Sequence, residues 1–284
     1  MTIDEALAWG KSAIASESPR LDTELLLGEC LDKPRAYLFT WPDNTLSNLQ
    51  EACFKEMIKK RQAGVPIAHL IGAREFWGMH FQVTPDTLIP RPDTEILVEQ
   101  ALAKLDILKQ TNPSPIQLID LGTGSGAIIC AIKKEQPDIQ AYASDQHAQA
   151  LAIAQQNASL HQLDIQFYQG SWLEPFSEQT FDLIVTNPPY IETDDPHLSQ
   201  GDVQFEPITA LTSGADGLEA IRHIVQQSAS HLNIGGWLLI EHGYQQAEAV
   251  QKLLASAGFE QIETHDDYGH NPRVTLGCTS ANRR

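Results

Sequence analysis

Short apolar runs alternate with helical patterns from about residue 93 to the end of the chain. The runs have strand length and end at glycine or polar residues, whereas apolar residues between them recur at helical spacing. The predicted strands are IQLIDLG, IQAYASD, IQFYQG, FDLIVTN and GGWLLIEHG, followed by runs near 259–265 and 273–278. Helices are predicted near 93–110, from Ala127, and near 147–160, 216–231 and 245–257. This alternation predicts an α/β fold, with a parallel sheet covered by helices on both faces.

The last two apolar runs are joined by the short loop DDYGHNP, with no helix between them. A parallel connection needs a longer crossover, so we expect these two strands to pair as a hairpin. The sheet should then have one antiparallel edge strand.

The N-terminal part of the chain has a different pattern. Apolar residues recur at helical spacing up to about residue 62, which predicts a small helical bundle. From Val65 to Pro92, aromatic and β-branched residues alternate with glycine and proline, as is typical of a short hairpin and a linker. We therefore predict a helical domain at 1–64, a linker at 65–92 and an α/β domain at 93–284.

Charge and composition narrow the class of partner. The chain has 284 residues and a net charge of −18, and residues 76–284 carry −16 of it. Such a field repels a phosphate backbone, so we expect no direct binding of nucleic acid. The four cysteines have no CxxC spacing, the histidines form no ligand pattern, and there is no apolar run of membrane-spanning length. These features predict a cytoplasmic protein without a metal and without membrane attachment. We also expect it to be a monomer.

A glycine-rich loop follows the first strand of the α/β part. In DLGTGSG, Gly122, Gly124 and Gly126 lack side chains, so that the backbone can approach a ligand closely. The next strand ends at Asp145, whose carboxylate can bind the hydroxyls of a ribose. Taken singly, each feature could equally be a tight turn or a helix N-cap. Together they favour a ribose-bearing cofactor, and an NAD-type dinucleotide remains an alternative at this point.

The fourth strand ends in a rigid corner, TNPPY. Pro188 and Pro189 lack N–H groups and have a fixed φ, so the Pro188 carbonyl can remain free as an acceptor. Asn187 offers a second acceptor oxygen, and Tyr190 offers an aromatic face. This fork fits a planar NH2 group whose nitrogen is aimed at an electrophilic methyl group. The alternative, a stiff surface turn, is less favoured beside the glycine loop.

The sequence resembles amino-group methyltransferases with the NPPY motif and, more closely, the PrmC/HemK family of protein-(glutamine-N5) methyltransferases. The motifs that carry this resemblance are REFWG at 74–78, IPRPDTE at 89–95, DLGTGSGAI, SD at 144–145, GSW at 170–172 and NPPYI. NPPY alone also occurs in methyltransferases that act on nucleic acids, but the combination is more specific. The resemblance implies a Rossmann-like, seven-stranded α/β methyltransferase domain that uses S-adenosylmethionine, with a small helical N-terminal domain.

Residue roles follow from the resemblance. It implies that the cofactor is bound by Gly122, Thr123, Gly124, Ser125, Gly126, Asp145, Trp172 and Asn187. The substrate amide is expected to contact Asn187, Pro188, Pro189 and Tyr190, of which all but Pro189 are the expected catalytic residues. Phe76 and Arg91 resemble residues at the mouth of the site, although a core aromatic and a surface cation are equally good interpretations.

The expected function is methyl transfer from S-adenosylmethionine to the glutamine of the GGQ motif in class I peptide chain release factors, in support of translation termination. The N-terminal domain is expected to help hold the release factor. One alternative is methylation of an amino group on a nucleic-acid base, against which the negative charge weighs. Another is a module that binds the cofactor or a partner without turnover.

Overall fold

The computed structural model describes residues 1–111 and 114–280, and it separates into two compact units. The first unit is Met1–Ala73 together with the short segment Ser199–Phe205. The second comprises Arg74–Leu198 and the chain from Glu206 onward. The chain thus changes unit after Ala73, and not after residue 64 as the sequence pattern suggests, because a short helix at Ile67–Ile71 packs against the helices of the first unit.

The first unit is helical. Its helices are α1 (Ile3–Ala13), α2 (Pro19–Leu31), α3 (Arg35–Thr40), α4 (Asn48–Gln62) and α5 (Ile67–Ile71). Capping boxes begin α1 and α4, because Thr2 and Ser47 each accept a backbone N–H one turn into the helix. Among the buried residues between the helices are Leu26, Leu38 and Phe54.

Cys30 and Cys53, which are distant in sequence, meet in this unit. Both are free thiols, and their Sγ atoms lie 2.7 Å apart between α2 and α4.

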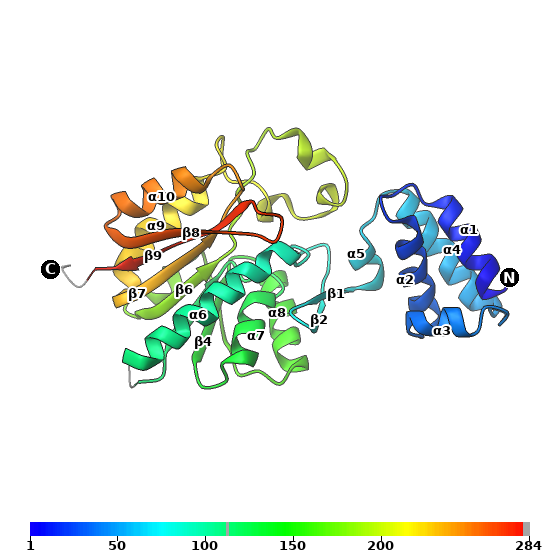
Figure 1. Cartoon of the computed structure of the whole chain (residues 1–284), viewed down its shortest axis with the longest axis horizontal. Helices are drawn as coiled ribbons and strands as arrows, with labels where there is room; N and C mark the ends of the chain where they lie inside the picture. Colours follow the sequence, from blue (N-terminus) through cyan, green and yellow to red (C-terminus); the bar gives the residue numbers. More distant parts are fainter. Residues whose placement is uncertain (112–113, 281–284) are drawn as a thin grey trace. The chain divides into compact units, whose positions relative to one another are not determined.

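The second unit is built on a seven-stranded sheet with the order β5-β4-β3-β6-β7-β9-β8 (Figure 1). Its strands are β3 (Gln117–Leu121), β4 (Gln140–Asp145), β5 (Gln166–Gln169), β6 (Phe181–Thr186), β7 (Leu232–Glu241), β8 (Phe259–Asp266) and β9 (Pro272–Thr279). The first five of these strands are parallel to one another, as predicted. A separate hairpin of β1 (Ala73–Phe76) and β2 (Met79–Gln82) lies in the segment that was predicted to hold a hairpin.

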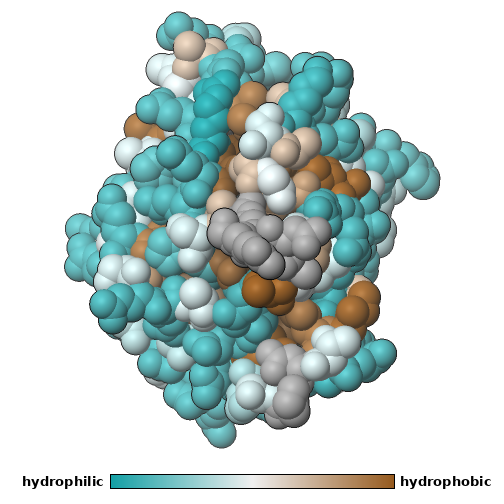
Figure 2. Space-filling model, turned by 90° about the vertical axis from the view of Figure 1, so that its left-hand side faces the viewer, coloured by the Kyte–Doolittle hydropathy of each residue, from teal (hydrophilic) through white to brown (hydrophobic). Residues whose placement is uncertain are grey.

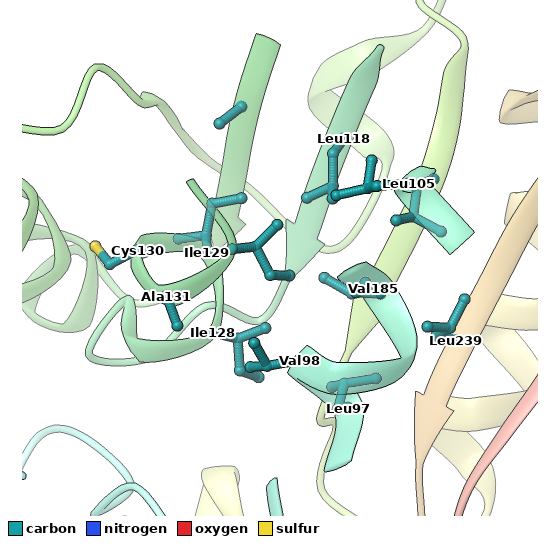
Figure 3. Packing of buried hydrophobic residues seen from close by; sticks show 14 of the residues in the cluster. Leu97, Val98, Leu105, Leu118, Ile128, Ile129, Cys130, Ala131, Val185 and Leu239 are labelled. Atoms are coloured by element: carbon teal, nitrogen blue, oxygen red, sulfur yellow. The ribbon is translucent and has the colours of Figure 1, made fainter. Parts of the chain in front are cut away.

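Helices cover both faces of the sheet. They are α6 (Glu95–Thr111), α7 (Ala127–Glu135), α8 (Ala148–Leu160), α9 (Glu219–His231) and α10 (Ala247–Ser256). Figure 1 shows α6, α7 and α8 on one face and α9 and α10 on the other. On the first face, side chains of α6 and α7 interlock with those of the central strands, among them Leu118, Val185 and Leu239 (Figure 3). The second face carries a separate apolar cluster with α9 and α10. The chain therefore has the Rossmann-like α/β architecture that the sequence predicts.

The last two strands form the predicted hairpin, but the predicted position of the antiparallel strand is wrong. The antiparallel strand is β9, and it lies between β7 and β8, so that β8 is the edge strand. Burial explains this order, because six of the eight residues of β9 are buried, whereas only one residue of β8 is buried and the strand carries the exposed Glu260, Glu263 and Asp266. A charged strand suits a sheet edge because it resists pairing with another chain.

One face of the second unit is largely polar. Figure 2 shows one face, mainly hydrophilic, on which apolar residues occur in smaller groups. Such a distribution is ordinary for an α/β unit whose helices turn their apolar sides to the sheet.

Candidate active site

The strand order reverses between β3 and β6, and the candidate residues gather at this point. From β3 the chain proceeds through β4 to β5 in one direction, whereas β6 and β7 lie on the other side. Leu121 pairs with Thr186, so the glycine loop and the NPPY corner leave the sheet side by side. In open α/β sheets, this position at the carboxyl ends of the strands is where ligands bind.

Asp145 organises the glycine loop. Its Oδ2 accepts the backbone N–H of Gly124 at 2.9 Å, and its Oδ1 accepts the N–H of His147 at 2.9 Å. The backbone of Gly122 and Thr123 is bound to the Ser144 carbonyl at 2.9 and 3.0 Å. Each carboxylate oxygen has a second lone pair, so Asp145 can still accept hydrogen bonds from a ligand in the cavity that it lines. The predicted acid and the predicted loop therefore form one structure.

Two of the loop glycines have different neighbours. At Gly122, which has φ +68°, a Cβ atom would lie 3.0 Å from the ring of Trp172. The indole thus packs directly on the loop backbone. Gly126, with φ +79°, faces away from the cavity and packs against Ala154 of α8. Gly126 is therefore needed for helix packing. It lines neither of the two hollows of the site, so the structure does not indicate that it contacts a ligand.

The glycine loop, Asp145 and Trp172 line a hollow of about 640 Å³ that is partly open to solvent. Its other walls include Leu88, Gln146, Asn187, Pro189 and Ala210.

A second hollow, of about 390 Å³, adjoins the first. Phe76, Pro90, Arg91 and Thr94 form one side of it, and the loop residues Thr123 and Ser125 form the other. Asn187 and Leu88 line both hollows. A group held at Asn187 is therefore accessible from two sides.

The NPPY corner presents two free acceptors, as its sequence predicts. Within residues 1–111 and 114–280, neither Asn187 Oδ1 nor the Pro188 carbonyl accepts a hydrogen bond. The Asn187 amide Nδ2 donates to Thr94 Oγ1 at 3.3 Å, which leaves the oxygen of the same amide for another donor. Tyr190 is half-buried against the apolar cluster on the α9 and α10 face.

Phe76 and Arg91, whose roles the sequence left open, both line the second hollow. Phe76 is nearly fully buried and packs edge-on against Phe81, so it is also a core aromatic. Arg91 forms an ion pair with Glu206, whose side chain is fully buried and also accepts the Ile89 N–H at 2.9 Å. Glu206 thereby binds the IPRP segment to the loop that follows the NPPY corner.

Acidic and phenolic groups of the site have perturbed pKa values. Burial raises the pKa of Asp120 to about 7, although its hydrogen bond from the Thr123 hydroxyl, at 2.6 Å, lowers it. The charge of Asp145 raises this pKa further. Burial, followed by the charge of Glu241, also raises the pKa of Tyr190, so this phenol is neutral at physiological pH. Burial thus disfavours the charged forms of both groups, so Asp120 is only partly ionised near neutral pH.

Gly217 lies against the backbone of the NPPY corner, and its replacement gives a testable prediction. Its φ is +68°, and an added Cβ atom would lie 2.3 Å from the Tyr190 carbonyl oxygen. At Gly235, with φ +78°, no atom lies within 4 Å of an added Cβ. Both alanine variants incur the cost of a left-handed residue, about 1–2 kcal/mol. Gly217→Ala should lose about 1–3 kcal/mol more of the free energy of unfolding, because it also overpacks the corner.

Urea denaturation of the two variants measures this difference. Gly235→Ala is the matched control for the backbone conformation. Equal losses in the two variants would show that the corner yields to the methyl group without cost.

Sequence reasoning missed Thr94, Glu241 and the segments that contain Leu88 and Ala210. Glu241 ends β7 in the same way that Asp145 ends β4, so the search for acids at strand ends could have found it. Thr94 lies in the quoted IPRPDTE motif, but a threonine there does not by itself indicate a role. Its role depends on its hydrogen bond with Asn187, which only the fold brings close. No motif or pattern in the sequence indicates that the loop residues near 209 and 210 belong to the site.

Two kinds of feature are absent from residues 1–111 and 114–280. No group of three or more His, Cys, Asp or Glu side chains is arranged to hold a metal ion. No helix in the same residues has both the length and the apolar character needed to span a membrane.

Comparison with known families identifies both parts of the chain. Residues 5–72 match the PrmC N-terminal domain, and residues 99–202 match the methyltransferase small domain. The chain is 46% identical to the release factor glutamine methyltransferase of Escherichia coli (strain K12) over 274 residues, which cover 95% of this chain and 97% of that protein. It is also 46% identical to the protein with the same description from Vibrio cholerae, with 98% of this chain and 96% of the relative covered.

Solved structures support the fold. The catalytic domain of hMettl16, in complex with the MAT2A 3'UTR hairpin 1, superposes with a TM-score of 0.56 at 16% identity, covering 74% of this chain and 77% of that one. A methyltransferase from Pyrococcus furiosus superposes with a TM-score of 0.51 at 15% identity, covering 80% of this chain and 98% of that one. At this level of identity the likeness concerns the fold alone.

Proposed function

This chain belongs to the family of release factor glutamine methyltransferases, and we propose that it transfers a methyl group from S-adenosylmethionine to the amide nitrogen of the GGQ glutamine in class I peptide chain release factors. The observation that carries this proposal is the position of Asn187. Its unpartnered amide oxygen lies where the two hollows meet, one residue before the unpartnered Pro188 carbonyl.

The larger hollow is the proposed site of S-adenosylmethionine, and the residues in it fit this cofactor. The backbone of the glycine loop allows close approach, the Asp145 carboxylate can bind ribose hydroxyls, and the indole of Trp172 offers a flat surface to the adenine. The Asp145 carboxylate in the wall of this hollow favours a cationic ligand. When bound, S-adenosylmethionine supplies an electrophilic methyl group on a positively charged sulfur.

The NPPY corner is the proposed site of the glutamine amide. One N–H would donate to Asn187 Oδ1, the other to the Pro188 carbonyl, and Tyr190 would pack on the amide plane. An amide nitrogen is a poor nucleophile because its lone pair is delocalised. Holding both hydrogens aims that nitrogen at the electrophile, so the residues lower the barrier by positioning. No strong base is required before attack, because the nitrogen loses its extra proton readily once it becomes cationic.

We also propose that the helical first unit helps to hold the release factor. Phe39 and Trp41, at and beyond the end of α3, expose about half of their side chains, and exposed aromatic residues are common in protein interfaces. Because release factors act during translation, the proposed substrate implies the cytoplasm as the place of action.

The test is mass spectrometry of an unmethylated class I release factor incubated with this protein and S-adenosylmethionine. We expect one added methyl group, which fragment mapping places on the GGQ glutamine. A release factor with glutamate in place of that glutamine is the control and should gain nothing. No gain on the normal release factor, while the protein still binds S-adenosylmethionine, would favour a nucleic-acid amino group or a binding module without turnover.

A further inference from the structure

Gln246 contacts the last residue of the NPPY corner. It occupies the N-cap position of α10, but its side chain makes no capping hydrogen bond to that helix. An N-cap side chain usually accepts a backbone N–H from the first turn of its own helix. The Gln246 amide instead donates from Nε2 to the Tyr190 carbonyl at 3.0 Å. This side chain therefore supports the corner and not the helix that it begins.

The direction of the Gln246 amide is fixed by its neighbours. Its Oε1 accepts the backbone N–H of Gly243 at 2.9 Å. Its Nε2 faces two backbone carbonyls, that of Tyr190 at 3.0 Å and that of Asp216 at 3.4 Å. Turning the amide over would place its oxygen against two acceptors and its NH2 group against a donor. These bonds therefore keep the donor side of the amide toward Tyr190.

Two glycines leave room for this amide. An added Cβ atom at Gly217 would lie 2.7 Å from Gln246 Nε2, and one at Gly243 would lie 3.1 Å from Gln246 Oε1. A side chain on either glycine would therefore crowd the amide. Because the backbone packs closely on both sides, the Gln246 amide has little freedom to move away from the Tyr190 carbonyl.

The backbone at Gly243 is itself held in place by His242. This histidine is fully buried, and burial lowers its pKa, so the ring is neutral at neutral pH. Its Nδ1 bonds to the Gly243 carbonyl at 2.9 Å, and its Nε2 to the Thr275 hydroxyl at 2.7 Å. A carbonyl can only accept, so Nδ1 carries the hydrogen and Nε2 accepts the hydroxyl. The partner of Gln246 Oε1 is therefore also fixed.

The NPPY corner needs support from outside its own backbone. Pro188 and Pro189 have no N–H groups, so they cannot anchor the corner by donating hydrogen bonds. The corner begins after Thr186, the last residue of β6, which the sheet holds. The bond from Gln246 to the Tyr190 carbonyl holds the other end. The corner is thus fixed on both sides of the prolines.

We propose that Gln246 is a positioning residue for the transfer reaction: by binding the Tyr190 carbonyl, its amide holds the Tyr190 ring and the Pro188 carbonyl in the directions in which they meet the substrate amide. Gln246 lines neither hollow, so it acts through Tyr190 and not by contact with a ligand. The inference rests on the proposed function for its effect on the rate. The bond to Tyr190 does not depend on which substrate is used.

The first test observes this bond by NMR of the full chain, without substrate. Tyr190 and Ile191 form the only Tyr-Ile step in the sequence, so carbonyl carbon-13 in tyrosine and nitrogen-15 in isoleucine isolate one peptide group. A carbonyl carbon signal moves upfield when the carbonyl loses a hydrogen bond. We expect this shift in Gln246→Met, which keeps the length of the side chain but has no donor. An unchanged carbonyl signal would overturn the proposal.

The second test compares single-turnover rates at saturating release factor and S-adenosylmethionine, at about pH 8, where a glutamate side chain is ionised. Gln246→Met should lower the rate about tenfold, because the Tyr190 carbonyl loses its donor. Gln246→Glu should lower it about 100-fold, because a carboxylate places an acceptor against that carbonyl. The affinity for S-adenosylmethionine should stay within about twofold, since Gln246 does not line the larger hollow.

Gln245→Met is the matched control, since Gln245 is exposed at the neighbouring position and should leave the carbonyl signal and the rate unchanged. A wild-type rate in Gln246→Met would overturn the positioning role. A rate for Gln246→Glu no lower than that of Gln246→Met would also overturn it, because the polarity of the amide would then play no part.

The remaining outcomes are equally decisive. Loss of the folded state in Gln246→Met, measured by circular dichroism, would overturn the proposal, because the residue would then be needed for the whole fold. If the wild-type protein does not methylate the release factor, the proposed function has failed. The Tyr190 carbonyl signal still decides in that case whether Gln246 holds the corner.

Discussion

Asn187→Ala is expected to lower the methyl-transfer rate at least about 100-fold, while the affinity for S-adenosylmethionine changes by no more than a fewfold. The variant removes the acceptor at the junction of the two hollows and leaves one amide hydrogen of the substrate unbound. The amide nitrogen can then rotate away from the direction of attack. The glycine loop and Asp145, which are the proposed cofactor residues, bond with each other and not with Asn187, so cofactor binding should largely persist.

Single-turnover kinetics with saturating release factor and S-adenosylmethionine measure this loss, and calorimetric titration measures the affinity. Asn48→Ala, the same substitution at an exposed position that begins α4, is the control. Asn187→Asp separates the two functions of the amide, because it keeps an acceptor oxygen but removes the donor to Thr94. A single-turnover rate for Asn187→Ala equal to that of the wild type would exclude the assigned role.

Asp145→Ala is expected to weaken the binding of S-adenosylmethionine by about 100-fold. Hydrogen bonds to a charged group contribute about 1.5–3 kcal/mol each, so the loss of the bonds to ribose alone accounts for this factor. The carboxylate also holds the backbone of Gly124 and His147, and its removal leaves the glycine loop less ordered. Because Asp145 does not contact the NPPY corner, the rate at saturating cofactor should fall much less than the affinity.

Calorimetry on the purified full chain tests this prediction. Asp164→Ala, an exposed aspartate just before β5, serves as the control and should bind like the wild type. Asp145→Asn should fall between the two, because its amide can accept at one oxygen but opposes a backbone N–H with its own NH2 group. An unchanged affinity in Asp145→Ala would show that ribose is bound elsewhere.

The two variants should therefore separate binding from chemistry. One is expected to affect affinity and the other the rate, although both residues line the same hollow. Loss of both quantities in both variants would instead indicate that the strand ends behave as one unit, whose geometry collapses when any member is removed.

Most of the fold could be predicted from the sequence, since it follows from local patterns. Strand-length apolar runs and helical spacing are properties of neighbouring residues, and they predicted the parallel strands and their covering helices. The order of β8 and β9 was missed because the loop between them specifies a hairpin but not which strand pairs with β7. Their composition held a usable signal, since the charged strand lies at the edge.

The motifs that form the site could likewise be predicted from the sequence. The glycine loop, Asp145 and the NPPY corner each require particular residues in consecutive positions, for reasons of backbone freedom, charge and rigidity. Their occurrence at strand ends was enough to expect them at one edge of the sheet. In the structure the bond from Gly124 to Asp145, and the pairing of Leu121 with Thr186, bring them together.

Only the tertiary structure determined which distant residues contact the residues of these motifs. Thr94, which accepts the Asn187 amide N–H, comes from a separate part of the chain, and its neighbours in sequence do not reveal this role. The same is true of Glu206, which binds Ile89 and Arg91 more than a hundred residues away. The physical reason is that a motif specifies its own backbone conformation, whereas hydrogen-bond direction and pKa depend on the groups that folding brings within reach.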